Sequence, residues 1–162
     1  MANNILEIKG LKKYFPVYSA AGIKQKGVFV KAVDGIELSV DEGEILGLVG
    51  ESGSGKSTTG YVIIGMYGVT EGEILFKGEC VSTNTNNRCL RLKKDIQIVF
   101  QDPGTTLNPQ RSIREILRLP LQIHGMLNKQ NKETQIIRIL ESVGLSSDFL
   151  DKYPTMIGGR RK

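Results

Sequence analysis

The sequence contains no tryptophan, one histidine and two cysteines, and no apolar run approaches the ~20 residues of a membrane-spanning helix. Its first ten residues lack the basic and then apolar pattern of a signal peptide. Cys80 and Cys89 have no CxxC spacing and no histidine nearby, so we expect free thiols rather than a disulfide or a metal site. Together these absences predict a cytoplasmic protein and exclude a disulfide scaffold.

The composition is that of one ordinary globular domain, with 162 residues of which 40% are hydrophobic and 24% are charged. The 22 Lys and Arg against 17 Asp and Glu give a formal net charge of +5. The basic residues are scattered, which argues against a nucleic-acid-binding face. A solvated surface explains the charge, and nucleotide phosphate would also suit a basic protein.

The N-terminal part of the chain alternates apolar with polar residues, which predicts a small antiparallel sheet. Residues 5–8 are expected to form a strand, followed by a long loop through Lys26. The Asp34-Gly35 pair lies between two alternating segments, 28–33 and 36–40, and is the expected hairpin turn.

An α/β core is expected next, because the unbroken apolar run at 45–49 is typical of a parallel strand covered on both faces. A helix over 57–67 follows, with Gly68 as its C-terminal cap. Further strands are expected at 73–76 and 96–100.

Helical patterns replace strand patterns in the last third of the chain. A capping box at Ser112-Ile113-Arg114-Glu115 begins a helix whose apolar face ends before Pro120. A second amphipathic helix is expected over 132–143, stopping at Gly144.

Residues 50–57, Gly-Glu-Ser-Gly-Ser-Gly-Lys-Ser, match the phosphate-loop pattern G-x-x-x-x-G-K-[ST] between an expected strand and an expected helix. The glycines allow successive N–H groups to point at an anion, and the helix N-terminus adds a positive dipole end. Lys56 is expected to reach the β and γ phosphates, and the Ser57 hydroxyl to bind Mg²⁺. The expected nucleotide contacts are Gly50, Ser52, Gly53, Ser54, Gly55, Lys56, Ser57 and Thr58.

Hydrolysis would also need a group that holds the metal from the opposite side. Gln101 and Asp102 follow the last expected strand, and spacing alone leaves open which of the two serves the metal. A small-molecule kinase is an alternative that fits the same loop, with Asp102, Arg111 and Arg114 at an acceptor site. A GTPase is disfavoured, because Asn128-Lys129-Gln130-Asn131 ends in Asn instead of the Asp that pairs with guanine.

Three sequence segments distinguish between these families by their resemblance to known proteins: KAVDGIELSVDEGE at 31–44, LVGESGSGKST at 48–58 and IQIVFQDPGTTLNP at 96–109. Together they resemble the ATP-binding subunit of an ABC transporter, most of all the subunits that drive bacterial import of oligopeptides and dipeptides. The resemblance implies a P-loop NTPase core with an N-terminal antiparallel β subdomain in residues 1–104 and a partial helical subdomain in residues 105–162.

The resemblance also implies ATP and Mg²⁺ as cofactors. It implies transmembrane subunits and a second ATP-binding subunit as partners, and a peripheral position on the cytoplasmic face of the bacterial inner membrane. In the family the Gln matching Gln101 lies in the Q-loop, where it contacts Mg²⁺ or water. An early aromatic residue stacks on adenine, and Phe15 matches it better than its neighbour Tyr14. In the family the helical region also meets a coupling helix of the transmembrane subunit, which assigns its apolar residues to docking. Amphipathic helices usually bury such faces internally, so we favour a satellite core.

The family signature Leu-Ser-Gly-Gly-Gln would fall where this chain has Met156-Ile157-Gly158-Gly159-Arg160. The printed sequence also has no counterpart of the Walker B Asp, the catalytic Glu or the switch His, which His124 does not match. The resemblance therefore indicates a chain cut off before the catalytic half of the core, which we expect to be marginally stable, oligomeric or completed by a partner. We expect it to bind ATP with Mg²⁺ but to have negligible turnover alone. A non-catalytic nucleotide-binding fragment is the remaining alternative.

Overall fold

The computed structural model describes residues 4–81, 88–102, 106–127 and 130–157. The chain divides into two compact units, Met1–Ile98 and Val99–Lys162, which are described separately. The expected boundary between residues 104 and 105 stays a prediction. Among the residues that the structure describes, no helix has the length and apolar character needed to cross a membrane.

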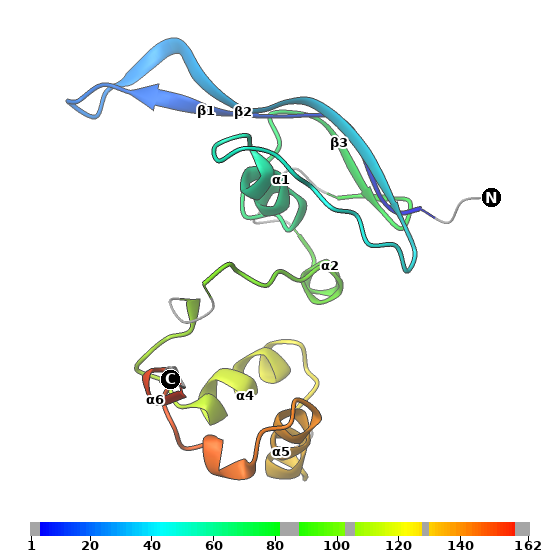
Figure 1. Ribbon diagram of the computed structural model, residues 1–162, viewed down its shortest axis with the longest axis vertical. Coiled ribbons are helices and arrows are strands. Elements are labelled where there is room, and N and C mark those ends of the chain that lie inside the picture. The colour runs from blue at the N-terminus through cyan, green and yellow to red at the C-terminus, as the bar shows by residue number, and fades with distance from the viewer. Residues whose placement is uncertain (1–3, 82–87, 103–105, 128–129, 158–162) are drawn as a thin grey trace. The chain divides into compact units, whose positions relative to one another are not determined.

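The first unit is built on an antiparallel sheet with the strand order β2-β1-β3-β4 (Figure 1). This confirms the predicted N-terminal antiparallel sheet and the strand near residues 73–76. The strands are β1 (Asn4–Tyr18), β2 (Lys24–Asp41), β3 (Glu71–Phe76) and β4 (Glu79–Cys80).

The hairpin turn lies elsewhere than the sequence predicts. β1 and β2 form one long hairpin, and its turn is closed by the Ser19 N–H, which donates to the Ile23 carbonyl at 2.8 Å. The expected loop through Lys26 is therefore mostly strand. Asp34-Gly35 lies inside β2, where the register shifts and Gly35 has a φ of 79°. The pair forms a β-bulge, because turn residues that permit positive φ serve bulges as well as turns.

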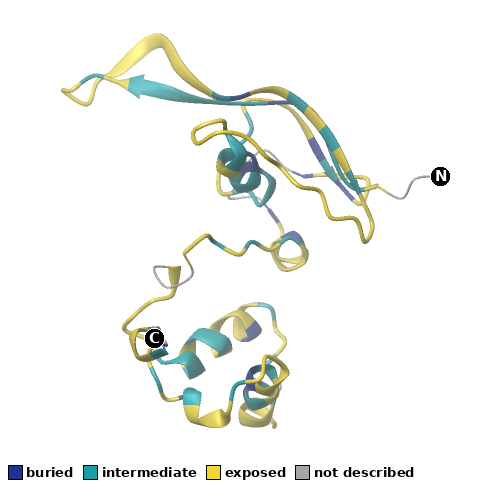
Figure 2. Ribbon diagram, viewed as in Figure 1, coloured by how far each residue is buried: buried dark blue, intermediate teal, exposed yellow. Residues whose placement is uncertain are grey.

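The helix α1 (Lys56–Ile63) packs on this sheet. Val62 is fully buried and joins a core drawn from β1, β2 and β3, which Figure 2 shows as dark segments on the strands and on α1. The predicted C-terminal cap, Gly68, is wrong. Gly65 takes that position, since the Gly65 N–H donates to Val62 and the Met66 N–H donates to Tyr61, the pattern of a Schellman motif. The buried core residues are Ile8, Leu11, Val33, Val62, Ile74, Phe76, Val81 and Leu92.

The two apolar segments at 45–49 and 96–100 do not form the predicted strands. Ile45 is 97% exposed, Val49 90% and Val99 91%. An extended segment becomes a strand only when a neighbour supplies the other half of the hydrogen-bond ladder. None of the described strands pairs with either segment. A short helix that the sequence did not predict, α2 (Leu90–Asp95), lies just before the segment 96–100.

The second unit is helical, as the sequence predicts, with its own small core. Ile136, Leu140 and Leu150 are almost fully buried there, which favours the satellite-core interpretation of the apolar faces. Gly144 follows the second long helix and its N–H donates to Glu141, so the expected stop is confirmed. The helices are α4 (Ile113–Ile123), α5 (Lys132–Ser142), η2 (Ser147–Phe149) and α6 (Pro154–Ile157).

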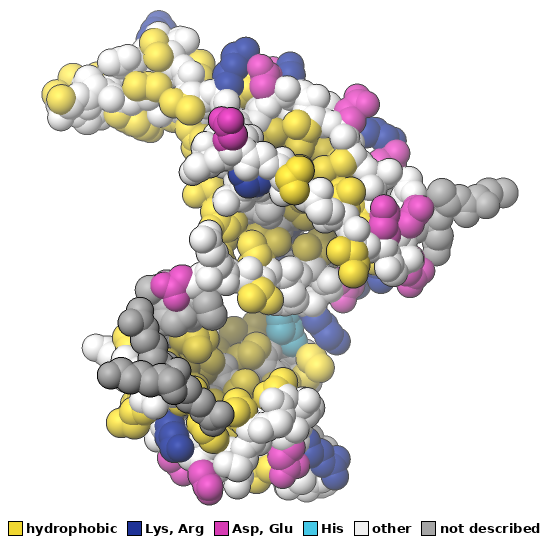
Figure 3. All heavy atoms as spheres, in the orientation of Figure 1, with side chains coloured by type: hydrophobic (Ala, Val, Ile, Leu, Met, Phe, Trp, Pro, Cys, Tyr) yellow, Lys and Arg dark blue, Asp and Glu magenta, His cyan; other side chains and the backbone are white. Residues whose placement is uncertain are grey.

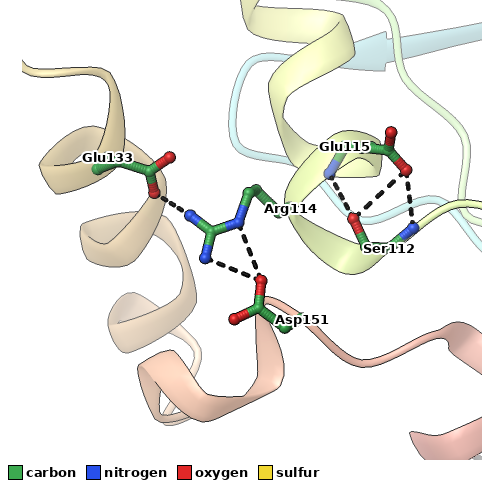
Figure 4. A network of polar contacts seen from close by, with 5 residues as sticks. All are labelled: Ser112, Arg114, Glu115, Glu133 and Asp151. Carbon is green, nitrogen blue, oxygen red and sulfur yellow. Dashed lines mark hydrogen bonds and ion pairs between the residues drawn. The ribbon is translucent and has the colours of Figure 1, made fainter.

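The predicted capping box starts α4. The Glu115 N–H donates to the Ser112 hydroxyl at 3.4 Å, and the Ser112 N–H donates to the Glu115 carboxylate at 3.0 Å (Figure 4). Next to it, the Arg114 guanidinium pairs with Glu133 of α5 and, at 2.9 Å, with Asp151. This arginine therefore links three segments of the unit, although its ion pairs are solvent-exposed and individually weak.

α4 continues through Pro120, beyond the apolar face that the sequence predicts before this residue. A proline inside a helix lacks an N–H and typically costs about 3 kcal/mol. The helical bonding nevertheless resumes, since the His124 N–H donates to the Pro120 carbonyl at 3.0 Å. Leu121 is 9% exposed and packs in the core with Ile136 and Leu140, and this burial offsets the lost hydrogen bond.

We predict that Gly72→Ala destabilises the chain more than Gly78→Ala. Both glycines have a positive φ, 88° and 75°, so both substitutions carry the backbone cost of about 1–2 kcal/mol. A Cβ on Gly72 would also lie 2.6 Å from the Lys9 carbonyl oxygen, whereas one on Gly78 would meet nothing within 4 Å. The additional loss of unfolding free energy is about 1–3 kcal/mol, measured by urea denaturation followed by circular dichroism. Equal losses in the two variants would contradict the close approach of β1 and β3.

Candidate functional site

The phosphate loop lies between the exposed segment 45–49 and the start of α1. It is a tight turn in which the Ser54 N–H donates to the Glu51 carbonyl at 3.2 Å. Ser52, Gly53 and Ser54 are exposed at its tip. The sequence therefore predicted the loop and the helix that follows it correctly, although the strand expected before it is absent.

Gly55 fixes where the loop meets the sheet. Its φ is 93°, and a Cβ there would overlap the carbonyl oxygen of Ala32 in β2. Only glycine satisfies both the backbone conformation and the close approach. The Gly55 carbonyl then accepts the Thr59 N–H at 2.8 Å and the Thr59 hydroxyl at 3.0 Å, which starts α1. Among the residues that the structure describes, no side chain caps the N-terminus of this helix, so its first N–H groups are available to an anion.

The Lys56 ammonium lies inside the loop. It donates to the Gly50 carbonyl at 2.8 Å, to the Glu51 carbonyl at 2.6 Å and to the Ser54 hydroxyl at 3.3 Å. Ser57 is exposed on the first turn of α1, beside the half-buried Thr58. The structure thus brings every predicted phosphate-contacting residue into one loop and one helix turn. A positive charge and a helix N-terminus meet there, the combination that attracts phosphate.

Phe15 lies on β1 in the same unit as the loop. Its ring packs edge-to-face on Tyr67, with centroids 5.2 Å apart, and Tyr67 in turn packs on Tyr61 of α1 at 5.8 Å. The Lys13 ammonium lies 4.8 Å from the centre of the Phe15 ring, and partial burial lowers the pKa of this lysine. The stacking of Phe15 on adenine stays a prediction.

Tyr14 contacts Asp34 and not the aromatic residues around Phe15. Its hydroxyl donates to the Asp34 carboxylate, and this hydrogen bond raises the pKa of Tyr14 and lowers the pKa of Asp34. The Lys31 ammonium lies 5.3 Å from the Tyr14 ring centre. Because successive side chains on a strand point to opposite faces, Tyr14 and Phe15 serve opposite sides of the sheet. Phe15 therefore remains the better match for the adenine-stacking residue.

Sequence reasoning missed the residue that caps the other end of α1. Arg88 is 6% exposed, and its guanidinium donates to the carbonyls of Ile63 at 2.5 Å and Val62 at 3.2 Å. Burial lowers its pKa, and its Nε has no hydrogen-bond partner among the described atoms. A Cβ on Gly65 would lie 2.5 Å from the Arg88 Cζ, so the glycine makes room for the arginine. No local pattern marks Arg88, which ends a segment that the sequence predicts to be a polar loop.

The remaining predicted site residues belong to the second unit. Gln101 is exposed there, and its role at a Mg²⁺ site stays a prediction. His124 follows α4 as its C-terminal cap. The signature-like residues Gly158, Gly159 and Arg160 lie outside the described residues, as do the first two residues of the Asn-Lys-Gln-Asn segment.

Comparison with known proteins identifies the family. The model of the family described as ABC transporter matches residues 33–162, which is most of the chain and includes the phosphate loop. The chain belongs to the ABC transporter family. This assignment confirms the resemblance, and it gives the small-molecule kinase alternative no support.

Individual relatives agree with this assignment. The chain is 44% identical to the oligopeptide transport ATP-binding protein AppF of Bacillus subtilis, over 98% of this chain and 48% of AppF. It is 40% identical to the dipeptide transport ATP-binding protein DppF of Haemophilus influenzae, over 98% of this chain and 48% of DppF. The chain thus spans about half the length of these curated ABC relatives.

Solved ABC structures share the fold. The dimeric post-hydrolysis state of the ATP-binding cassette MJ0796, bound to ADP and Pi, superposes with a TM-score of 0.69 at 25% sequence identity. The match covers 95% of this chain and 63% of that cassette. The fold is therefore a partial ABC ATPase cassette, with the antiparallel sheet, the phosphate-loop helix and a helical part.

We predict that Arg88→Met lowers the free energy of unfolding by about 1–3 kcal/mol, because two carbonyls at the end of α1 lose a charged donor while staying buried. Arg91→Met is the matched control. Arg91 is exposed and bonded to Glu79, so its loss should change stability by no more than about 0.5 kcal/mol. Urea denaturation measures both, and equal effects would refute the capping role of Arg88.

Proposed function

We propose that this chain binds ATP with Mg²⁺ through residues 50–58, as part of the ATP-binding component of a bacterial peptide importer. The observation that carries the proposal is the Lys56 ammonium held inside a glycine-rich loop at the uncapped N-terminus of α1. Members of the ABC family bind ATP, normally with Mg²⁺, and the family match spans this loop.

The residues of the loop fit a polyphosphate. The Lys56 ammonium would exchange its carbonyl and hydroxyl partners for β and γ phosphate oxygens, which are stronger acceptors because they are charged. The N–H groups of α1 would donate to the same phosphates. A Cβ on Gly50 would come within 2.9 Å of the Ser54 hydroxyl, so a side chain there would fill the cradle. The exposed Ser57 hydroxyl would coordinate Mg²⁺.

Phe15 would hold the base of the nucleotide. A stacking residue needs an accessible ring face, and Phe15 is only partly buried. Its contacts with Lys13 and Tyr67 would orient the ring, and the Lys13 ammonium would move aside or remain on the face opposite the base.

Peptides are the proposed cargo of the complete transporter, on the basis of the relatives AppF and DppF, which are named for oligopeptide and dipeptide transport. In such an importer the chain would work with transmembrane subunits and a second ATP-binding subunit. It would then be a peripheral protein on the cytoplasmic side of the membrane.

Isothermal titration calorimetry with ATP and MgCl₂ tests nucleotide binding. We expect Lys56→Ala to weaken binding roughly 10- to 150-fold, because a charge-assisted hydrogen bond contributes about 1.5–3 kcal/mol. Ser57→Ala should remove the difference in affinity between buffers with Mg²⁺ and with EDTA.

Lys94→Ala is the control, since Lys94 is an exposed lysine on α2. Equal affinity of the Lys56 and Lys94 variants, in chains that give the circular dichroism spectrum of the unaltered protein, would overturn the proposal.

A further inference from the structure

The turn end of the β1–β2 hairpin exposes large apolar side chains. We call residues 18–30 the hairpin tip, which extends past α1 in Figure 1 and carries hydrophobic side chains on its surface in Figure 3. Tyr18 is 58% exposed, Ile23 69%, Val28 45%, Phe29 49% and Val30 57%. Such a concentration of exposed apolar side chains marks an interaction site.

The apolar side chains lie on both faces of the hairpin. Val28, Phe29 and Val30 are consecutive residues of β2, so Phe29 points to one face while Val28 and Val30 point to the other. A strand packed on one partner has one apolar and one polar face. A protein docked on either face of the tip would leave the other face exposed to water. A medium that surrounds the tip covers both faces.

The charge around the tip has one sign. Between Tyr14 and Val33 the sequence has three lysines and no aspartate or glutamate. Lys24 and Lys26 are exposed beside the turn, and Lys31 pairs with Asp34 at the base of the tip. This charge complements a negatively charged surface.

We propose that the hairpin tip inserts into the interfacial layer of a bilayer that contains anionic phospholipid. The apolar side chains would enter about 5–10 Å deep, a depth typical of interfacial segments. The stems of Lys24 and Lys26 would lie along the apolar layer while their ammonium groups reach the lipid phosphates. Water is still present at this depth, so the edge N–H and C=O groups of the two strands remain solvated. Direct contact with lipid goes beyond the proposed function, in which other subunits hold the chain at the membrane.

Fluorescence tests insertion directly, because the chain has no tryptophan of its own. Phe29→Trp places a single reporter in the tip. Vesicles of phosphatidylcholine with phosphatidylglycerol should shift its emission to shorter wavelength, and brominated lipids should quench it, whereas phosphatidylcholine alone should have little effect. Ile123→Trp, at a 52% exposed apolar position of α4, is the matched reporter and should neither shift nor be quenched.

Sedimentation with the same anionic vesicles tests the charge. We expect the double substitution Lys24→Gln and Lys26→Gln to lower the partition coefficient roughly 30-fold, about fivefold for each lysine near an anionic surface. The matched variant, Lys93→Gln with Lys94→Gln, loses the same charge on α2 and should bind like the unaltered chain.

Three results would overturn the proposal. The unaltered chain could fail to sediment with anionic vesicles, or both tryptophan reporters could respond equally. The Phe29→Trp emission could also shift with protein concentration in the absence of lipid, which would identify a second copy of the chain as the occupant of the tip.

Discussion

The position of α1 on the sheet is the constraint on which the nucleotide site depends. The helix is fixed at both ends. At its start Gly55 lies against the Ala32 carbonyl with no room for a side chain, and at its end Arg88 donates to the last carbonyls. In the same last turn the Val62 side chain is fully buried in the core of the sheet. Because the phosphate loop is the chain immediately before α1, these three contacts decide where Lys56 and the helix N–H groups lie.

Strand formation in this chain follows pairing and not apolar content. Four of the five residues at 45–49 are apolar, yet Ile45 and Val49 are almost completely exposed and belong to none of the described strands. β1 is interrupted by glycine and proline and contains several lysines, yet it pairs along most of its length because β2 and β3 flank it. A hydrogen-bond ladder needs two partners, so a segment's own composition decides only half of the outcome.

Local signals were predicted well and distant contacts poorly. The capping box at Ser112 and the stop at Gly144 came directly from the sequence, because their hydrogen bonds join residues three to five positions apart. The hairpin turn was misplaced, because positive φ at Gly35 serves a bulge whose register depends on β1. The apolar face predicted to end before Pro120 continues past it, because Leu121 is buried against α5, a contact that no local pattern shows.

The sequence by itself determined the phosphate loop, its helix and the ABC family. The loop's glycines, lysine and serine act within nine consecutive residues, and their spacing decides which groups can surround a phosphate. Only the tertiary structure decided that Phe15 packs with Tyr67, that Tyr14 turns to Asp34, and that Arg88 closes α1 from a distance of 25 residues. The physical reason is that backbone conformation at a glycine is a local property. Burial and hydrogen-bond partners are set by segments that meet only when the chain has folded.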